Sequence, residues 1–139
     1  MDVPASSVFY GLAIALNTGF GMVYLTKPRF MPYHQAAVET DWDLLPKGVR
    51  ILILALMRVA ASAMLAWSLM AGSALVMGLH LQSHWMAWLM PASGAIISLG
   101  SLYAMLSVAR NTPGRPPLWT FPVGMGLLVA GLVTSQMPH

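Results

Sequence analysis

One basic and three acidic side chains are the residues of this sequence best suited to bind a ligand. Arg58 lies inside a long apolar stretch, where a charge costs ~2.5–3.5 kcal/mol at the bilayer centre and less near its border. The carboxylates that could offset this cost are Glu39, Asp41 and Asp43, which alternate along the chain. In an extended segment they would share one face.

Together with His34, these side chains predict a polar pocket that faces the cytoplasm. Such a pocket could bind an anionic lipid headgroup through Arg58, or a divalent cation through the carboxylates. The alternative is that Arg58 extends its guanidinium to the membrane surface, or pairs with one acid only to hold the loop. In that case the remaining carboxylates face water and bind no ligand.

Two further groups of residues are candidates. His80 and His84 bracket a short connection, and imidazole together with methionine thioether suits copper. The alternative is that these histidines are polar helix ends, because the 12 methionines are spread over the whole chain. Asn17 lies in the middle of an apolar stretch, so we expect it to bond to another helix, with ligand contact as the alternative.

Several activities are excluded by what the sequence lacks. It has no cysteine, which removes thiolate chemistry and cysteine-ligated metal. It has no HExxH, GxSxG or glycine-rich phosphate loop, and no carboxylate inside its apolar stretches, as a proton-coupled exporter would need. The sequence therefore favours a protein that is not an enzyme and has no cofactor, copper being the one alternative.

The elements that must position these residues are apolar helices. Of the 139 residues 58% are hydrophobic and 8% charged, against about 25% charged in soluble domains. The stretches 7–26, 50–79, 85–108 and 118–135 predict helices that cross a ~30 Å hydrocarbon layer, with a polar loop at 27–49. We expect residues 1–139 to form one all-α, integral membrane domain, an up-down-up-down four-helix bundle.

The basic residues predict the orientation of this bundle. The loops after the first and third stretches, counted together with Arg50 at the border of the second stretch, hold six Lys and Arg, and the opposite side holds none. Because positive loops stay in the cytoplasm, both termini should be non-cytoplasmic. The basic residues sit at the ends of apolar runs, where they contact lipid headgroups, and we expect no nucleic-acid partner.

Small residues recur at every fourth position in each apolar stretch. Such stripes allow close contact between helices in lipid, and they predict a compact bundle, a homo-oligomer or a partner membrane protein. The stripes are Gly11, Ala15 and Gly19; Ser62, Ala66, Ala74 and Gly78; Gly94 and Ser98; and Gly126, Ala130 and Thr134.

Several short strings resemble a known group of proteins. They are Phe30-Met31-Pro32-Tyr33-His34, Trp42 with the Arg50/Arg58 pair, Asn111-Thr112-Pro113, and Pro116-Pro117-Leu118-Trp119. The chain is similar to small bacterial four-helix membrane proteins that are loosely DoxX-like. This resemblance implies a multi-pass protein of the bacterial cytoplasmic (inner) membrane, and it implies no functional residues.

Three functions follow, in order of preference. The first is a non-enzymatic accessory or assembly subunit, or a homo-oligomer, in contact with membrane lipids. The second is a protein that binds a lipid or small molecule, or a membrane enzyme, that uses the Arg58 pocket. The third is copper handling at the outer face.

Overall fold

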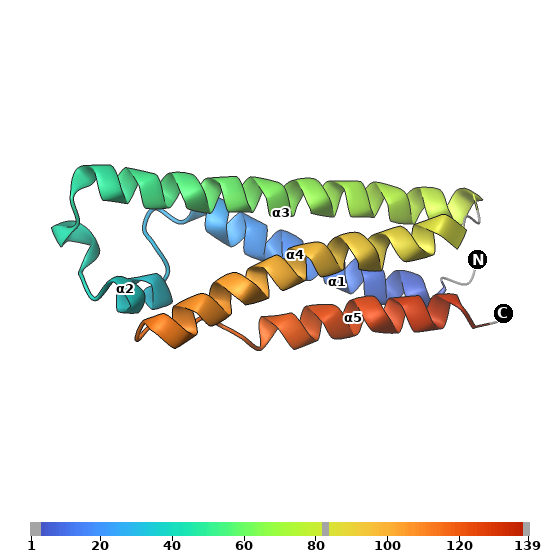
Figure 1. Cartoon of the computed structure of the whole chain (residues 1–139). Helices are drawn as coiled ribbons and strands as arrows, with labels where there is room; N and C mark the ends of the chain where they lie inside the picture. Colours follow the sequence, from blue (N-terminus) through green and yellow to red (C-terminus); the bar gives the residue numbers. More distant parts are fainter. Residues whose placement is uncertain (1–3, 82–83, 138–139) are drawn as a thin grey trace.

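The computed structural model describes residues 4–81 and 84–137, and within the helices it leaves out the side chains of residues 79–87. Over these ranges the chain is all-α, as predicted, with five α-helices, one 3₁₀ turn and no strand. The helices are α1 (Ala5–Thr26), α2 (Pro32–Val38), η1 (Trp42–Leu44), α3 (Lys47–Leu81), α4 (His84–Asn111) and α5 (Thr120–Ser135) (Figure 1).

Three of the helices are long and apolar enough to cross a membrane. The spans are Ala5–Thr26, Lys47–Gly78 and Trp88–Asn111, and they coincide with the first three predicted stretches. The chain is therefore a membrane protein by length and composition. The fourth helix, α5, is apolar but has 16 residues, ~24 Å at 1.5 Å per residue, so its crossing stays a prediction.

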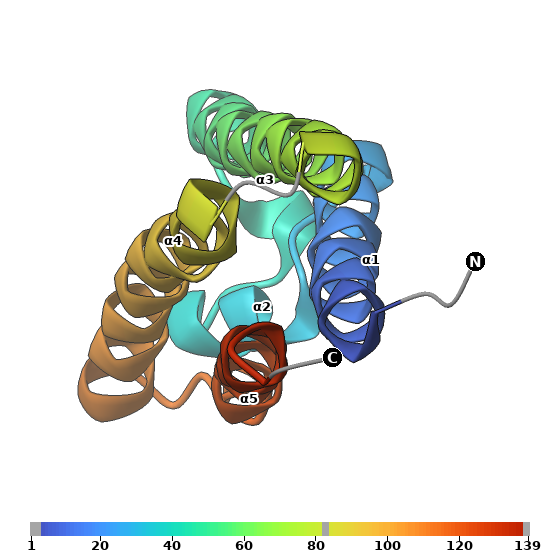
Figure 2. The same cartoon turned by 90° about the vertical axis from the view of Figure 1, so that its right-hand side faces the viewer.

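The four long helices lie side by side around a common interior (Figures 1 and 2). Helix α1 packs between α3 and α5, and α4 completes the ring by packing against α5 and, less extensively, against α3. The first residues of α1 and the last of α5 lie at one end, and α2 lies at the other (Figure 1). We refer to these as the terminal end and the α2 end.

Two apolar clusters hold this arrangement together. The first consists of Tyr10 and Ala13 on α1, Ala71 on α3, Met90 on α4 and Leu128 on α5, so it joins all four long helices. The second lies near the α2 end, where the buried Phe30, Leu45 and Met57 pack with Tyr24, Met31, Trp42, Ile53 and Leu54. The interior between the clusters is bounded by helices but is not filled.

The loop between α1 and α3 is folded, and this corrects the expectation of an extended segment. Pro32 begins α2, a position where its missing N–H costs nothing. Glu39 ends that helix in the left-handed conformation, with φ 54°, and Asp41 precedes η1. Since the backbone turns at Glu39, the alternation of Glu39, Asp41 and Asp43 does not place them on one strand face.

The small-residue stripes do not, in general, form the contacts within this chain. A Cβ added at Gly11, Gly19 or Gly126 would meet no atom within 4 Å, so these glycines make no close helix contact within this chain, and their contact with another chain stays a prediction. Gly94 is the exception, because its added Cβ would lie 2.6 Å from Leu128 Cδ1. The buried face of α1 is set instead by Tyr10 and its neighbours in the first cluster.

Candidate ligand-binding cavity

A cavity of about 390 Å³ lies in the unfilled interior. All four long helices, α2 and the α4–α5 connection contribute to its wall. The lining residues are Ala13, Leu16, Asn17, Phe20, Tyr24, Met31, Tyr33, His34, Ala60, Met64, Trp67, Gly94, Ile97, Ser98, Ser101, Ala104, Met105, Val108, Pro116, Pro117, Thr120, Phe121, Gly124 and Leu128. The size falls within the ~300–1,000 Å³ typical of small-molecule sites.

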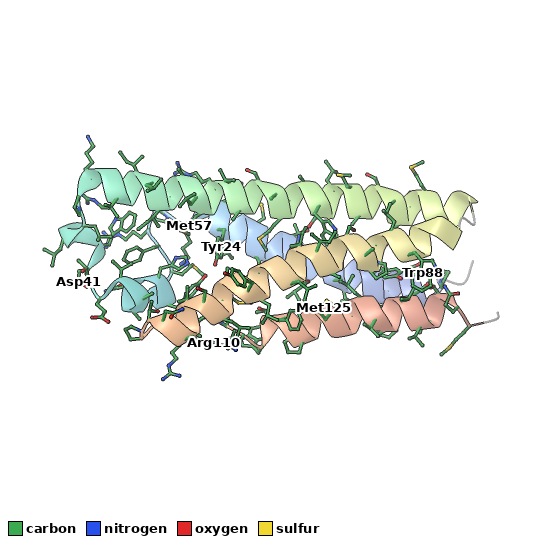
Figure 3. All side chains as sticks on the ribbon, viewed as in Figure 1. Tyr24, Asp41, Met57, Trp88, Arg110 and Met125 are labelled. Atoms are coloured by element: carbon green, nitrogen blue, oxygen red, sulfur yellow. The ribbon has the colours of Figure 1, made fainter. Side chains whose placement is uncertain are left out.

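The wall of the cavity carries no formal charge. In the part of the chain that the structure describes, no Lys, Arg, Asp or Glu lines it. Most lining side chains are apolar. Three polar aromatic residues, Tyr24, Tyr33 and His34, meet at the α2 end, and the wall elsewhere includes the polar residues Asn17, Ser98, Ser101 and Thr120. Figure 3 shows Tyr24 and Met57 near this end, and Trp88 near the terminal end. The cavity therefore has a mainly apolar body and one polar pole.

Helix α2 is held against the α2 end of the cavity by close packing and by a hydrogen bond. Gly114, in the α4–α5 connection, is buried, and a Cβ there would lie 2.7 Å from the carbonyl oxygen of Tyr33 and 2.9 Å from Ala37 Cβ. The hydroxyl groups of Tyr24 and Tyr33 form a hydrogen bond between α1 and α2. The connection and α1 thus fix α2 from two sides.

The ring of His34 packs edge-on against both tyrosines of this pole, with centroids 6.2 Å from Tyr24 and 4.2 Å from Tyr33. The backbone N–H of Met31 donates to His34 Nδ1 at 3.3 Å. Because Nδ1 accepts this bond, the neutral imidazole carries its proton on Nε2. His34 is then a hydrogen-bond donor at the wall of the cavity.

Burial keeps this pole uncharged near neutral pH. It lowers the pKa of His34 from its ordinary value of 6.5, since desolvation disfavours the imidazolium. Burial also raises the pKa of Tyr33, and the hydrogen bond to Tyr24 adds to this effect. Both side chains therefore present neutral hydrogen-bonding groups to the cavity.

Acidification is expected to loosen α2. The undocked helix binds a proton at the ordinary pKa of 6.5 and the docked helix at a lower pKa, so docking is fully favoured above pH 6.5 and weakens as the pH falls below that value. A proton on Nδ1 would also remove the acceptor of the Met31 N–H. Hydrogen exchange of residues 32–38, corrected for intrinsic rates, should accelerate at low pH in the wild type but not in His34→Phe. Equal pH profiles would contradict this role of His34.

Asn17 joins α1 to α3 from the middle of the first span. Its Nδ2 donates to the backbone oxygen of Met64 at 2.7 Å and to Ser68 Oγ at 2.9 Å, which confirms the expected bond to another helix. Both amide hydrogens are used in this way. Among the described residues no donor reaches its Oδ1, which leaves a carbonyl oxygen as an acceptor at the cavity wall.

Replacing Asn17 by leucine is expected to destabilise the protein by about 0.6–1.7 kcal/mol, the range for hydrogen bonds between membrane helices. The matched control is Thr18→Val, because the Thr18 hydroxyl donates only within its own helix, to Ile14 O at 2.8 Å. Unfolding of both variants in mixed detergent micelles by SDS measures the difference. If the two variants unfolded alike, the bonds from Asn17 would not join the helices.

Arg58 does not enter the cavity, and it does not meet the carboxylates. It is exposed on α3, one residue after Met57. Met57 belongs to the second cluster together with Tyr24, which lies two residues before the end of α1. Arg58 thus lies at the level where the first span ends, and its guanidinium can reach the membrane surface. The expected pocket of His34, Arg58 and three acids is not formed, and of these residues only His34 lines the cavity.

The three acidic residues are exposed, and two of them interact with residues other than Arg58. Asp43 pairs with Arg29 at 3.5 Å, a weak surface interaction because both groups are largely in solvent. Asp41 Oδ1 accepts a hydrogen bond from Gln35 Nε2 at 2.6 Å. Among the side chains that the structure describes, which leave out residues 79–87, no three from His, Asp or Glu lie close enough together to hold a metal ion.

The predicted copper ligands His80 and His84 lie outside the described side chains. Copper at the outer face therefore stays a prediction.

Sequence reasoning missed Tyr24 and Tyr33 as members of a site. Tyrosine is common at the membrane border, so its occurrence near the end of an apolar stretch does not by itself indicate a site. The signal that could have found them is the Pro32-Tyr33-His34 string, because a proline that begins a short helix sets the two aromatic residues behind it on an ordered backbone.

No family model, curated protein or solved structure matches the chain.

Proposed function

We propose that this protein binds an uncharged, largely apolar small molecule or lipid in the cavity between its helices. The observation that carries the proposal is the wall of the cavity, which is mainly apolar along its body, free of formal charge, and polar at the pole formed by Tyr24, Tyr33 and His34. A charged ligand would lose its hydration without gaining a partner charge. A neutral head can instead donate to Asn17 Oδ1 or accept from His34 Nε2–H.

The membrane arrangement that we propose with it has four spans, α5 included, in an up-down-up-down bundle. The support for this orientation is the distribution of Lys and Arg, which are gathered in the loops at the α2 end. Such loops are retained in the cytoplasm, so both termini are non-cytoplasmic. The resemblance to small bacterial four-helix proteins favours the bacterial inner membrane. We propose no catalytic step.

Filling the cavity tests the binding function. Ser98 lines the cavity, and Ser98→Phe is expected to lower the ligand retained during purification in mild detergent by about tenfold, because overfilling a packed site costs ~1–3 kcal/mol. The matched control is Ile96→Phe, since Ile96 on the same helix is 74% exposed. Native mass spectrometry and lipid extraction measure bound molecules. If wild type, variant and control carried the same molecules in the same amounts, the proposal would be wrong.

A second candidate function is that of a subunit in a membrane complex, either with itself or with another protein. The observation that favours it is the outward stripe of α1, where Gly11 and Gly19 have open space beside them and Ala15 is exposed. Stripes of this spacing join helices in lipid. Gly19→Leu should then shift the oligomeric state seen by native mass spectrometry, whereas Gly100→Leu on α4, also with open space, should not.

A further inference from the structure

The cavity has one side wall that is not closed. Of its lining residues, Ala60 on α3 and Ser101 and Ala104 on α4 are exposed, and every other one is buried or half-buried. All three exposed residues have small side chains and belong to the same two neighbouring helices. The cavity therefore opens to the outside of the molecule between α3 and α4.

The geometry of α3 and α4 explains this opening. The two helices meet where Trp67 Nε1 donates to Ser93 Oγ at 3.0 Å, and where a Cβ on Gly94 would lie 3.2 Å from Trp67 Cζ2. From there they diverge towards the α2 end, as α4 crosses away from α3 (Figure 1). Ala60 and Ser101 lie on the diverging side of this contact, seven residues from Trp67 and from Gly94, respectively.

Packed residues bound both ends of the cavity. At the terminal end, Tyr10, Ala71, Met90 and Leu128 pack into one buried cluster. At the α2 end, Tyr33 and His34 form the wall, and the buried Gly114 leaves no space between α2 and the α4–α5 connection. We therefore expect a ligand to reach the cavity through the side opening between α3 and α4.

We propose that the ligand enters from the bilayer through this opening, and that it is a membrane-dissolved amphiphile with an uncharged head rather than a cytosolic solute. This inference rests on the proposed binding function. Ala60 lies three residues, ~4.5 Å along the helix, from Met57, which packs at the level where α1 ends. The opening therefore faces the first part of the acyl-chain region, just below the headgroups of the cytoplasmic leaflet. The neutral pole at Tyr33 and His34 lies at the same end of the cavity. A membrane-dissolved amphiphile in the cytoplasmic leaflet has its head at this level before it enters.

The experiment follows the loading of a photoactivatable long-chain alcohol that carries a diazirine in its chain. The full-length protein is reconstituted in phosphatidylcholine vesicles, the probe is added to the membrane, and covalent adducts are mapped by mass spectrometry after illumination at increasing times. Adducts are expected on the cavity wall. A matching probe with a phosphate head in place of the hydroxyl should label the cavity at least about tenfold less.

Narrowing the opening should slow loading. Ala60→Trp and Ala104→Trp are each expected to reduce the rate of cavity labelling by about tenfold, which corresponds to ~1.4 kcal/mol in the barrier. The matched controls are Ala63→Trp on α3 and Ala92→Trp on α4, both exposed positions that do not line the cavity. They should load like the wild type. Retention of the wild-type helical circular dichroism and unfolding midpoint shows that each variant is folded.

The outcomes separate this inference from the function on which it rests. If the wild type loads the alcohol and the Ala60 and Ala104 variants load as fast as their controls, the opening is not the route, and the binding function stands. If the phosphate probe labels the cavity as well as the alcohol, the uncharged head is wrong. If no probe labels the cavity of the wild type at all, both proposals are overturned.

Discussion

Replacing Gly94 by valine is expected to destabilise the protein by about 1–3 kcal/mol, the cost of forcing extra carbon atoms into a packed contact. Gly94 is buried where three helices meet, and its added Cβ would lie 2.6 Å from Leu128 Cδ1 on α5 and 3.2 Å from Trp67 Cζ2 on α3. Either the side chains of Leu128 and Trp67 must then change conformation or helix α4 must move away from both neighbours. Unfolding by SDS in mixed micelles measures the change, and ligand retention should fall with it because Gly94 also lines the cavity.

The control for this variant is Gly100→Val on the same helix. A Cβ at Gly100 meets nothing within 4 Å, while the change in helix propensity is the same as at position 94. The control is expected to unfold within about 0.5 kcal/mol of the wild type, as other surface changes do. If the two variants were equally destabilised, the packing around Gly94 would not explain the effect.

Replacing Gly114 by valine is expected to release α2 from the cavity. The added Cβ would lie 2.7 Å from a backbone atom, the carbonyl oxygen of Tyr33. It would also lie 2.9 Å from Ala37 Cβ and 3.1 Å from Val108 Cγ1. A backbone atom cannot rotate away as a side chain can. A cost of about 1–3 kcal/mol would speed hydrogen exchange of residues 32–38 by about tenfold or more.

The matched variant is Gly48→Val, in the first turn of α3, where an added Cβ meets nothing within 4 Å. It should leave exchange of residues 32–38 unchanged. Retained ligand should decrease in Gly114→Val, because the polar pole at Tyr33 and His34 would no longer be held against the cavity. Slow exchange of these residues in Gly114→Val would show that α2 is held by other contacts.

The sequence alone determined that this chain is helical and built for a membrane. Apolar runs of about twenty residues with few charges satisfy their backbone hydrogen bonds as helices. The first three predicted stretches agree with the three helices that are long and apolar enough to cross a membrane. The bond from Asn17 to another helix was predictable for the same reason, because a polar amide in hydrocarbon needs a partner. These properties depend on composition and on local energy, which a linear sequence records.

The faces of the helices were decided only by the tertiary structure. The spacing of four residues predicted that Gly11 and Gly19 contact another helix. The contacts of α1 within the chain instead lie on a different face, around Tyr10 and Ala13. In lipid the hydrophobic effect does not select which apolar face turns inward, and packing makes that choice. Shape complementarity is a property of two segments together, so it cannot be predicted from the sequence of either segment alone.

The candidate site depended on tertiary structure for the same reason. The charge pattern pointed to Arg58 and to the acids of the loop, yet Arg58 lies exposed at the level where α1 ends, and the loop folds into α2 and η1. The cavity exists because α3 and α4 diverge, and its polar pole exists because α2 packs on Gly114. The cavity and its pole both depend on how segments far apart in the chain pack together. The sequence gives the types of these residues, but it does not show which of them come together in space.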